Sequence, residues 1–123
     1  MTTFTTGSRS HEMSEGTALI AEERLRQVMS EGWSAEHDDG HSTGEMAIAA
    51  ACYAIPDDVR EKPIWSATLL EYLWPWEFAW WKPAAKTRSE RKARESRIRE
   101  LVKAGALIAA EIDRLQRLKV TTK

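Results

Sequence analysis

The sequence predicts an all-α fold with a long C-terminal helix, and three observations support this prediction. Apolar residues recur at helical spacing near both ends of the chain, and no stretch alternates between apolar and polar residues as a half-buried strand does. The 123 residues, 42% of them hydrophobic, are enough for one globular domain. We expect this domain over residues 17–123, preceded by a flexible arm over residues 1–16 that is rich in Thr, Ser and Gly.

The first expected helix spans residues 17–31. Thr17 can cap its N-terminus, and Gly32 follows its last turn. Polar residues recur every four positions at Glu23, Gln27 and Glu31, so these side chains lie along one line of the helix.

The second expected helix spans residues 45–55. Ser42 and Glu45 match the Ser-x-x-Glu capping box at its start, and Pro56 ends it. After Glu45 the helix is apolar on all sides, so we expect it to be buried, with its alanines permitting close packing.

The segment over residues 57–86 has a weaker pattern. A short helix is expected to begin at Ser66, and residues 75–83, which lie between two prolines, are expected to be irregular. Five of the six Trp residues lie between residues 65 and 81. We expect them to contribute to the core and to contacts between subunits, because aromatic side chains dominate both.

A long last helix is expected over residues 87–119, where Thr87 and Glu90 form another capping box. Apolar residues step along it by three and four positions, which is typical of a helix-packing seam. This seam comprises Ile98, Leu101, Gly105, Ile108, Ile112 and Leu115. A helix of about thirty residues is about 45 Å long. Because that length exceeds the diameter of so small a domain, we expect its end to pack on a second copy.

The charges are divided unevenly along the chain. Residues 1–81 contain 14 acidic and 5 basic residues, whereas residues 82–123 contain 5 acidic and 13 basic residues. The net charge of −1 argues against a general attraction to nucleic acid or anionic membranes. No apolar run approaches the roughly 18 residues of a membrane span. The single Cys52 cannot form an internal disulfide, which indicates a reducing compartment such as the cytoplasm.

The segment over residues 31–45 concentrates acidic and imidazole side chains. Clustered carboxylates repel one another unless they are neutralised, and a divalent cation is the usual neutraliser. Oxygen ligands suit Mg²⁺ or Mn²⁺, and these ions most often act on phosphates. The candidate ligands are Glu31, Glu36, Asp38, Asp39 and Glu45. The alternative is a solvated acidic loop in which Asp39 or Ser42 caps a helix.

Several motifs together resemble a known family. They are Ile20-Ala-Glu-Glu-Arg24, Glu31-Gly-Trp33, Glu36-His-Asp-Asp39-Gly-His41, Gly44-Glu45-Met-Ala, Trp74-Pro-Trp76, Trp81-Lys-Pro83 and the segment from Arg99 to Leu115. Over residues 17–118 the chain resembles the small MazG-like proteins of phages, and most of all their MazZ-type dATP/dGTP diphosphohydrolases. The resemblance implies an oligomeric MazG-like helical bundle, present as a homodimer or homotetramer.

The resemblance also implies an activity. Such enzymes cut a purine deoxynucleoside triphosphate, dGTP above dATP, between its α- and β-phosphates, and two or three Mg²⁺ or Mn²⁺ ions bridge the phosphates. The dGMP would supply phage 2-aminoadenine nucleotide synthesis. In this chain Glu36, Asp39 and Glu45 would be the catalytic metal ligands, joined by Asp38 and Glu31. Substrate contacts are expected from Ile20, Glu23, Gln27, Trp33, Arg99 and Lys103, of which the last two would hold phosphates.

Other interpretations remain open. The basic run after residue 82 also fits a solvated helix face with ion pairs between successive turns. The family has a second acid three residues after the first. Here the residue three positions after Glu45 is Ile48, and the residue three positions after Glu100 is Lys103. These departures favour a catalytically silent helical module that oligomerises and binds a partner through its Trp-rich segment. No recognisable nucleic-acid-binding module is present, so no nucleic acid partner is expected.

Overall fold

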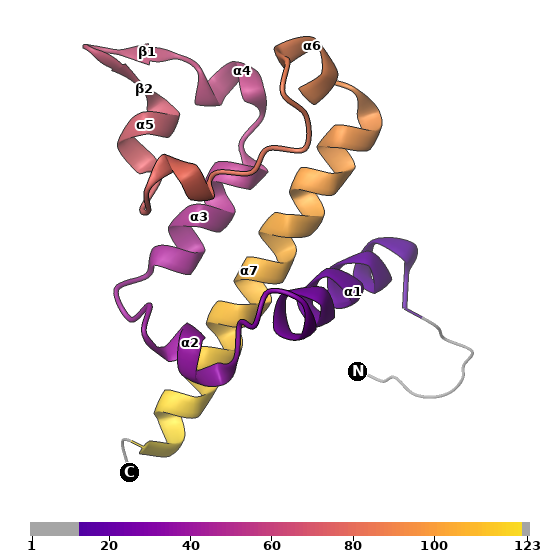
Figure 1. The fold of residues 1–123 in the computed structure, drawn as a ribbon, viewed down its shortest axis with the longest axis vertical. Helices are drawn as coiled ribbons and strands as arrows, with labels where there is room; N and C mark the ends of the chain where they lie inside the picture. The colour runs from indigo at the N-terminus through magenta and orange to yellow at the C-terminus, as the bar shows by residue number, and fades with distance from the viewer. Residues whose placement is uncertain (1–12, 122–123) are drawn as a thin grey trace.

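The computed structural model describes residues 13–121, and these are mostly helical, which confirms the all-α prediction (Figure 1). The elements are, in order, α1 (Glu15–Met29), α2 (Ala35–Asp39), α3 (Glu45–Ala54), α4 (Asp57–Arg60), β1 (Pro63–Ile64), β2 (Ala67–Thr68), α5 (Leu69–Leu73), the 3-10 helix η1 (Phe78–Trp80), α6 (Arg88–Arg91) and α7 (Arg94–Thr121). Residues 1–12 of the predicted arm lie outside the described residues. None of the helices within residues 13–121 is long and apolar enough to cross a membrane.

Two predicted helix caps are replaced by neighbouring residues. Ser14 caps α1 instead of Thr17, and its Oγ accepts the backbone N–H of Thr17 at 3.2 Å. The helix therefore begins inside the predicted arm. The Ser42–Glu45 capping box does not form, since Gly44 precedes α3 at a φ of 85°. The Glu45 carboxylate accepts the backbone N–H of Thr43 at 2.8 Å instead.

The predicted last helix is interrupted near its start. Thr87 accepts the backbone N–H of Glu90 at 3.1 Å, as expected, but this cap begins only the four-residue α6. The backbone turns at Lys92, and α7 begins at Arg94. The short helix expected from Ser66 begins three residues later as α5, because β1 and β2 first form an antiparallel hairpin. Strands of two residues are too short for an alternating pattern to appear in the sequence.

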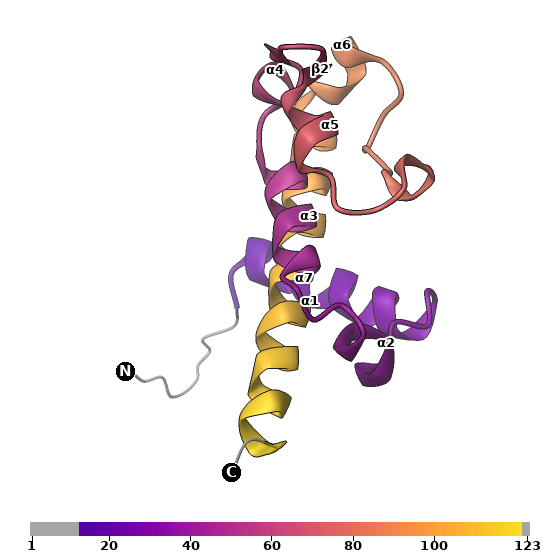
Figure 2. The ribbon, with the colours of Figure 1, turned by 90° about the vertical axis from the view of Figure 1, so that its left-hand side faces the viewer.

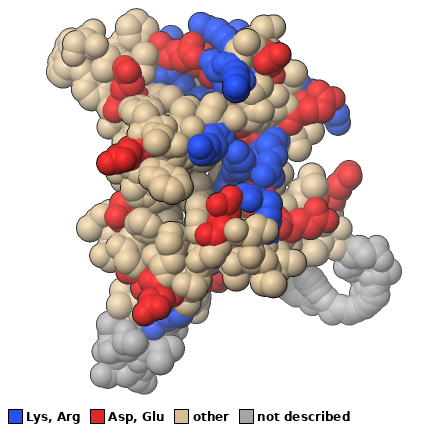
Figure 3. Space-filling view, viewed as in Figure 1, with Lys and Arg blue, Asp and Glu red and all other residues tan. Residues whose placement is uncertain are grey.

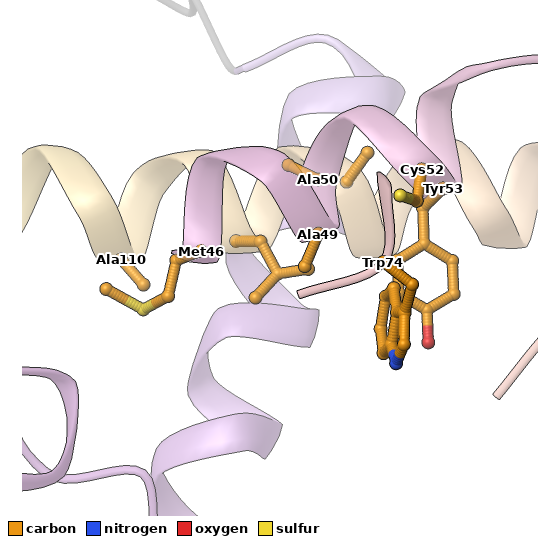
Figure 4. Packing of buried hydrophobic residues seen from close by; sticks show 9 residues of the cluster. Met46, Ala49, Ala50, Cys52, Tyr53, Trp74 and Ala110 are labelled. Atoms are coloured by element: carbon orange, nitrogen blue, oxygen red, sulfur yellow. The ribbon is translucent and has the colours of Figure 1, made fainter. Parts of the chain in front are cut away.

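The core lies between α3 and α7, which run antiparallel (Figures 1 and 4). Small side chains on both helices let the backbones approach closely, and larger side chains fill the two ends. The buried cluster comprises Met46, Ala49, Ala50, Cys52, Tyr53, Trp74, Ala104, Leu107 and Ala110. The expectation that the helix over residues 45–55 is buried on all sides is wrong, because Ala47, Ile48 and Ala51 are exposed. They lie on the face of α3 opposite the core.

Two arginines cap the C-terminal end of α3. Arg60 Nη1 donates to the carbonyl of Cys52 at 3.1 Å, and Arg97 Nη1 donates to the carbonyl of Tyr53 at the same distance. Arg97 also donates to the carbonyl of Ala54. The last carbonyls of a helix have no partner within the helix, and positive charge is favourable there. The two arginine side chains thus satisfy the last carbonyls of α3, which in many helices bond to backbone N–H groups around a C-terminal glycine.

Helix α1 crosses α7 at a steep angle, as Figure 2 shows, and Gly105 allows the close approach. A Cβ atom at Gly105 would lie 2.5 Å from Cδ1 of Ile20, so Ile20 occupies the space that a larger residue would need. Ile20, expected to contact the base, packs against α7 here.

Gly105→Ala is expected to lower the free energy of unfolding by about 1 kcal/mol, because overpacking outweighs the better helix propensity of alanine. Urea denaturation followed by circular dichroism measures this change. In an Ile20→Val background, which lacks Cδ1, the penalty should shrink. A stabilising effect of Gly105→Ala in both backgrounds would contradict the close contact.

The predicted seam of α7 faces away from the core. Leu101, Ile108, Ile112 and Leu115 are each about half exposed, at 46–51%. The buried residues of α7, such as Ala106 and Ala110, lie on the other side of the helix.

Helix α1 buries polar side chains and exposes apolar ones, which is the reverse of a helix that packs its apolar face on its own chain. Its two buried residues are Glu23 and Gln27. Leu25, Val28 and Met29 are exposed at 62%, 40% and 75%. Apolar side chains of both α1 and the α7 seam therefore stay exposed within residues 13–121, although Ile20 covers the seam at Gly105.

Candidate functional site

A cavity of about 1050 Å³ lies between the acidic segment and the Trp-rich segment. Its walls come from three parts of the chain: the junction of α1 with α2, the facing sides of α3 and α7, and the loop after α5. The lining residues are Glu31, Trp33, His37, His41, Met46, Tyr53, Trp74, Pro75, Trp76, Glu77, Trp80 and Leu107. We call it the aromatic cavity, because rings form most of its lining.

A continuous row of rings joins the two segments. The rings of Trp33 and His37 are stacked with centroids 5.4 Å apart. His41 lies 5.0 Å from His37 and 5.1 Å from Trp76, and Trp74 lies 5.5 Å from Trp76. The indole Nε1 of Trp76 is buried and has no hydrogen-bond partner within residues 13–121. The cavity thus offers flat apolar surfaces for a planar ligand.

Carboxylates orient both histidines. His37 Nδ1 lies 2.9 Å from Oδ1 of Asp38, and Arg24 donates to the other oxygen of this carboxylate at 2.7 Å. Asp38 is fully buried, and both its oxygens are engaged. His41 Nδ1 lies 3.5 Å from Oε2 of Glu45. The hydrogen bond from Thr43 lowers the pKa of Glu45 from 4.5 to about 2, so Glu45 is ionised at neutral pH.

The remaining predicted metal ligands lie apart. Asp39 pairs with Arg117 of α7 at 2.7 Å, and Glu31 pairs with Arg26 at 2.8 Å. Glu36 is exposed on α2, and its carboxylate has no partner among the described residues. Within residues 13–121 no three Asp, Glu, His or Cys side chains gather into a group that could hold a metal ion. Arginines neutralise most of the carboxylates that the sequence analysis assigned to a cation.

A second, smaller cavity of about 510 Å³ lies between α1 and α7 and contains two predicted substrate contacts, Glu23 and Arg99. Glu23 is buried, and both Arg26 and Arg99 pair with it at 2.8 Å. Burial by itself would raise the pKa of Glu23, but the hydrogen bonds from the two arginines outweigh it and hold the pKa below its usual value. Gln27 is buried and accepts a hydrogen bond from Arg24 at 3.4 Å. None of these residues lines the aromatic cavity.

Lys103 lies beside the aromatic cavity. Its Nζ is 5.5 Å from the ring centroid of Tyr53, which lines the cavity, and donates to the carbonyl of Lys82 at 2.7 Å. The Tyr53 hydroxyl accepts the backbone N–H of Lys82 at 3.0 Å. Burial, with the neighbouring charge of Arg99, lowers the pKa of Lys103. Figure 3 shows Lys and Arg side chains gathered over the N-terminal half of α7, flanked by Asp and Glu.

The structure therefore divides the predicted site. Glu31 and Trp33 line the aromatic cavity with Lys103 next to it, whereas Glu23 and Arg99 lie in the smaller cavity. Sequence reasoning missed Glu77, among other lining residues. The high density of tryptophans around it was a signal, but it was assigned to core and subunit contacts.

No family model, curated protein or solved structure matches the chain.

Proposed function

We propose that the chain is a metal-dependent diphosphohydrolase that converts a purine deoxynucleoside triphosphate, dGTP above dATP, to the monophosphate and pyrophosphate. The observation that carries the proposal is the aromatic cavity, where the acidic segment meets stacked rings and a lysine lies beside a lining ring, that of Tyr53. By the resemblance of the motifs, the dGMP formed would supply phage 2-aminoadenine nucleotide synthesis.

The cavity suits a nucleotide in size and chemistry. Its volume of about 1050 Å³ is at the upper end of the range usual for small-molecule sites. Trp33 and Trp76 offer ring faces on which a base can stack. Lys103, and Lys82 beside it, supply positive charge for the phosphates. In the proposed reaction a water oxygen bonds to the α-phosphorus, and the bond from this phosphorus to the bridging oxygen breaks, so that pyrophosphate leaves with the electron pair.

Mg²⁺ or Mn²⁺, two or three ions by the resemblance, would activate the water and neutralise the phosphates. The five predicted carboxylates have the right oxygen chemistry but do not converge in the single chain. Among residues 13–121 the carboxylates form no cage for the ions. Mg²⁺ commonly takes only one or two protein carboxylates together with substrate phosphates. Glu36, which has no partner among the described residues, and Glu31, which lines the cavity, are the first carboxylates to test.

We propose that the working form is a homodimer or homotetramer. Helix α1 buries Glu23 and Gln27 but exposes Leu25, Val28 and Met29, which is the opposite of what a stable single chain requires. The outer face of α7 is apolar over four turns. Exposed apolar surface of this extent marks an interface, and a second copy would cover it with matching faces.

Turnover assays test the proposed activity. Incubation with each dNTP and Mn²⁺ or Mg²⁺ is expected to release pyrophosphate and monophosphate in equal amounts, fastest with dGTP, and EDTA is expected to stop the reaction. Lack of turnover with every nucleotide would overturn the proposal.

Lys103→Met is expected to reduce kcat/KM by roughly ten- to hundredfold, because a charge-assisted contact to phosphate is lost. Steady-state kinetics with dGTP measure the effect. The matched control is Lys86→Met, since Lys86 is exposed and, unlike Lys103, is not placed over a ring of the aromatic cavity in the described residues. Equal activity of the two variants would remove Lys103 from the proposed site.

The second candidate function is a catalytically silent helical module that oligomerises and binds a partner. The ion pairs of Asp38, Asp39 and Glu31 with arginines favour it, because these carboxylates are already neutralised without a cation. An oligomer that releases no pyrophosphate from any nucleotide would support this alternative.

A further inference from the structure

Glu77 is the carboxylate of the aromatic cavity that has no partner. Glu31, the other acidic lining residue, pairs with Arg26 at 2.8 Å. Within residues 13–121 the Glu77 side chain makes no hydrogen bond or ion pair. Its backbone, by contrast, is held firmly: the carbonyl accepts Nε1 of Trp74 at 3.1 Å and the backbone N–H of Trp80 at 2.9 Å. Glu77, an exposed residue, thus presents an unpaired carboxylate to the cavity from a fixed backbone position between the lining residues Trp76 and Trp80 in the sequence.

An ionised carboxylate only accepts hydrogen bonds, so the edge of a planar ligand facing it has to donate. Guanine presents two adjacent donors, N1–H and the N2 amino group, which match the two oxygens of one carboxylate. Adenine presents its amino group next to the unprotonated N1, so one carboxylate oxygen would face a lone pair. A site built around hydrogen bonds rejects a ligand that leaves them unmade far more strongly than an apolar pocket does.

We infer that Glu77 is the specificity-determining residue that makes the aromatic cavity select guanine over adenine. This inference rests on the proposed function, which places a purine nucleotide in the cavity. The stacked rings hold either purine, and the carboxylate of Glu77 distinguishes between them.

Binding of dGMP, dIMP and dAMP tests the inference without any need for hydrolysis. Trp33, Trp74, Trp76 and Trp80 line the cavity, so tryptophan fluorescence reports a bound base. The wild-type protein is expected to bind dGMP most tightly, dIMP more weakly because hypoxanthine lacks the N2 amino group, and dAMP weakest. Glu77→Gln is expected to weaken dGMP binding by roughly ten- to hundredfold and to leave dAMP binding within about twofold.

Glu90→Gln is the matched control, because Glu90 is exposed on α6 and does not line the cavity. It should bind all three nucleotides as the wild-type protein does. Three results would overturn the inference: no preference of the wild-type protein for guanine, unchanged dGMP binding in Glu77→Gln, or an equal loss of dGMP and dAMP. Turnover is measured separately. A protein that selects dGMP through Glu77 but releases no pyrophosphate would refute the proposed activity and retain the assignment of Glu77.

Discussion

Glu100→Ala is expected to lower the free energy of unfolding by about 3–5 kcal/mol, the cost typical of breaking a buried ion pair. Glu100 is fully buried and accepts three hydrogen bonds. They come from Arg60 at 3.0 Å, from Arg97 at 3.2 Å and from the backbone N–H of Ala84 at 3.1 Å. Without this carboxylate the buried guanidinium of Arg60 keeps only Asp57 as a charged partner.

The same network explains why the effect should extend beyond one residue. Arg60 and Arg97 cap the carbonyls at the end of α3, so loss of their anchor also loosens the helix that carries the core. Urea denaturation monitored by circular dichroism measures the loss. Glu90→Ala is the control, because Glu90 is exposed on α6, and a change within about 0.5 kcal/mol is expected there. A loss below about 1 kcal/mol for Glu100→Ala would contradict the role given to the network.

Replacing Ile108 and Ile112 together by Glu is expected to convert the proposed oligomer into monomers. Both side chains are about half exposed in the single chain, at 48% and 51%, so the substitution costs the monomer little. In an interface the same two charges would be buried without partners, which costs several kcal/mol. The apparent dissociation constant should therefore rise by more than roughly a hundredfold. Size-exclusion chromatography with light scattering measures the change.

Gln116→Glu is the control for this pair, because Gln116 is exposed on the same helix but does not belong to the seam. A wild-type protein that is monomeric at all concentrations, or a double variant that retains the wild-type mass, would refute self-association through α7. If the double variant is monomeric, an assay of the proposed dGTP turnover shows whether that activity needs a neighbouring copy.

The fold could be predicted where the pattern was long. The apolar spacing over residues 98–115 lies within α7, and the apolar run before Pro56 corresponds to α3. The break between α6 and α7 was missed, because the capping residues at Thr87 and Glu90 indicate a helix start but not its length. The hairpin was missed because its strands have only two residues each, too few to show an alternating pattern.

The candidate site could be predicted only in part. Glu31 and Trp33 are near in sequence and lie on one cavity wall. The ion-pair partners of the acidic segment could not be predicted from local patterns, since Arg117, which pairs with Asp39, is 78 residues away in the sequence. The position of Glu77 in the same cavity also depends on how the loop after α5 folds back on α3 and α7.

The sequence by itself determined the helical class, the positions of the main helices and the concentration of acids before α3, because these depend on local spacing and composition. Only the tertiary structure decided which face of each helix is buried. Both faces of α7 are apolar, and small residues such as Ala110 allow α3 to approach on one side only. Packing also decided the charge partners of Asp38 and Asp39. Each of these carboxylates pairs with an arginine in the single chain. Close approach of backbones and long-range charge pairing are properties of the folded chain, and no short motif contains them.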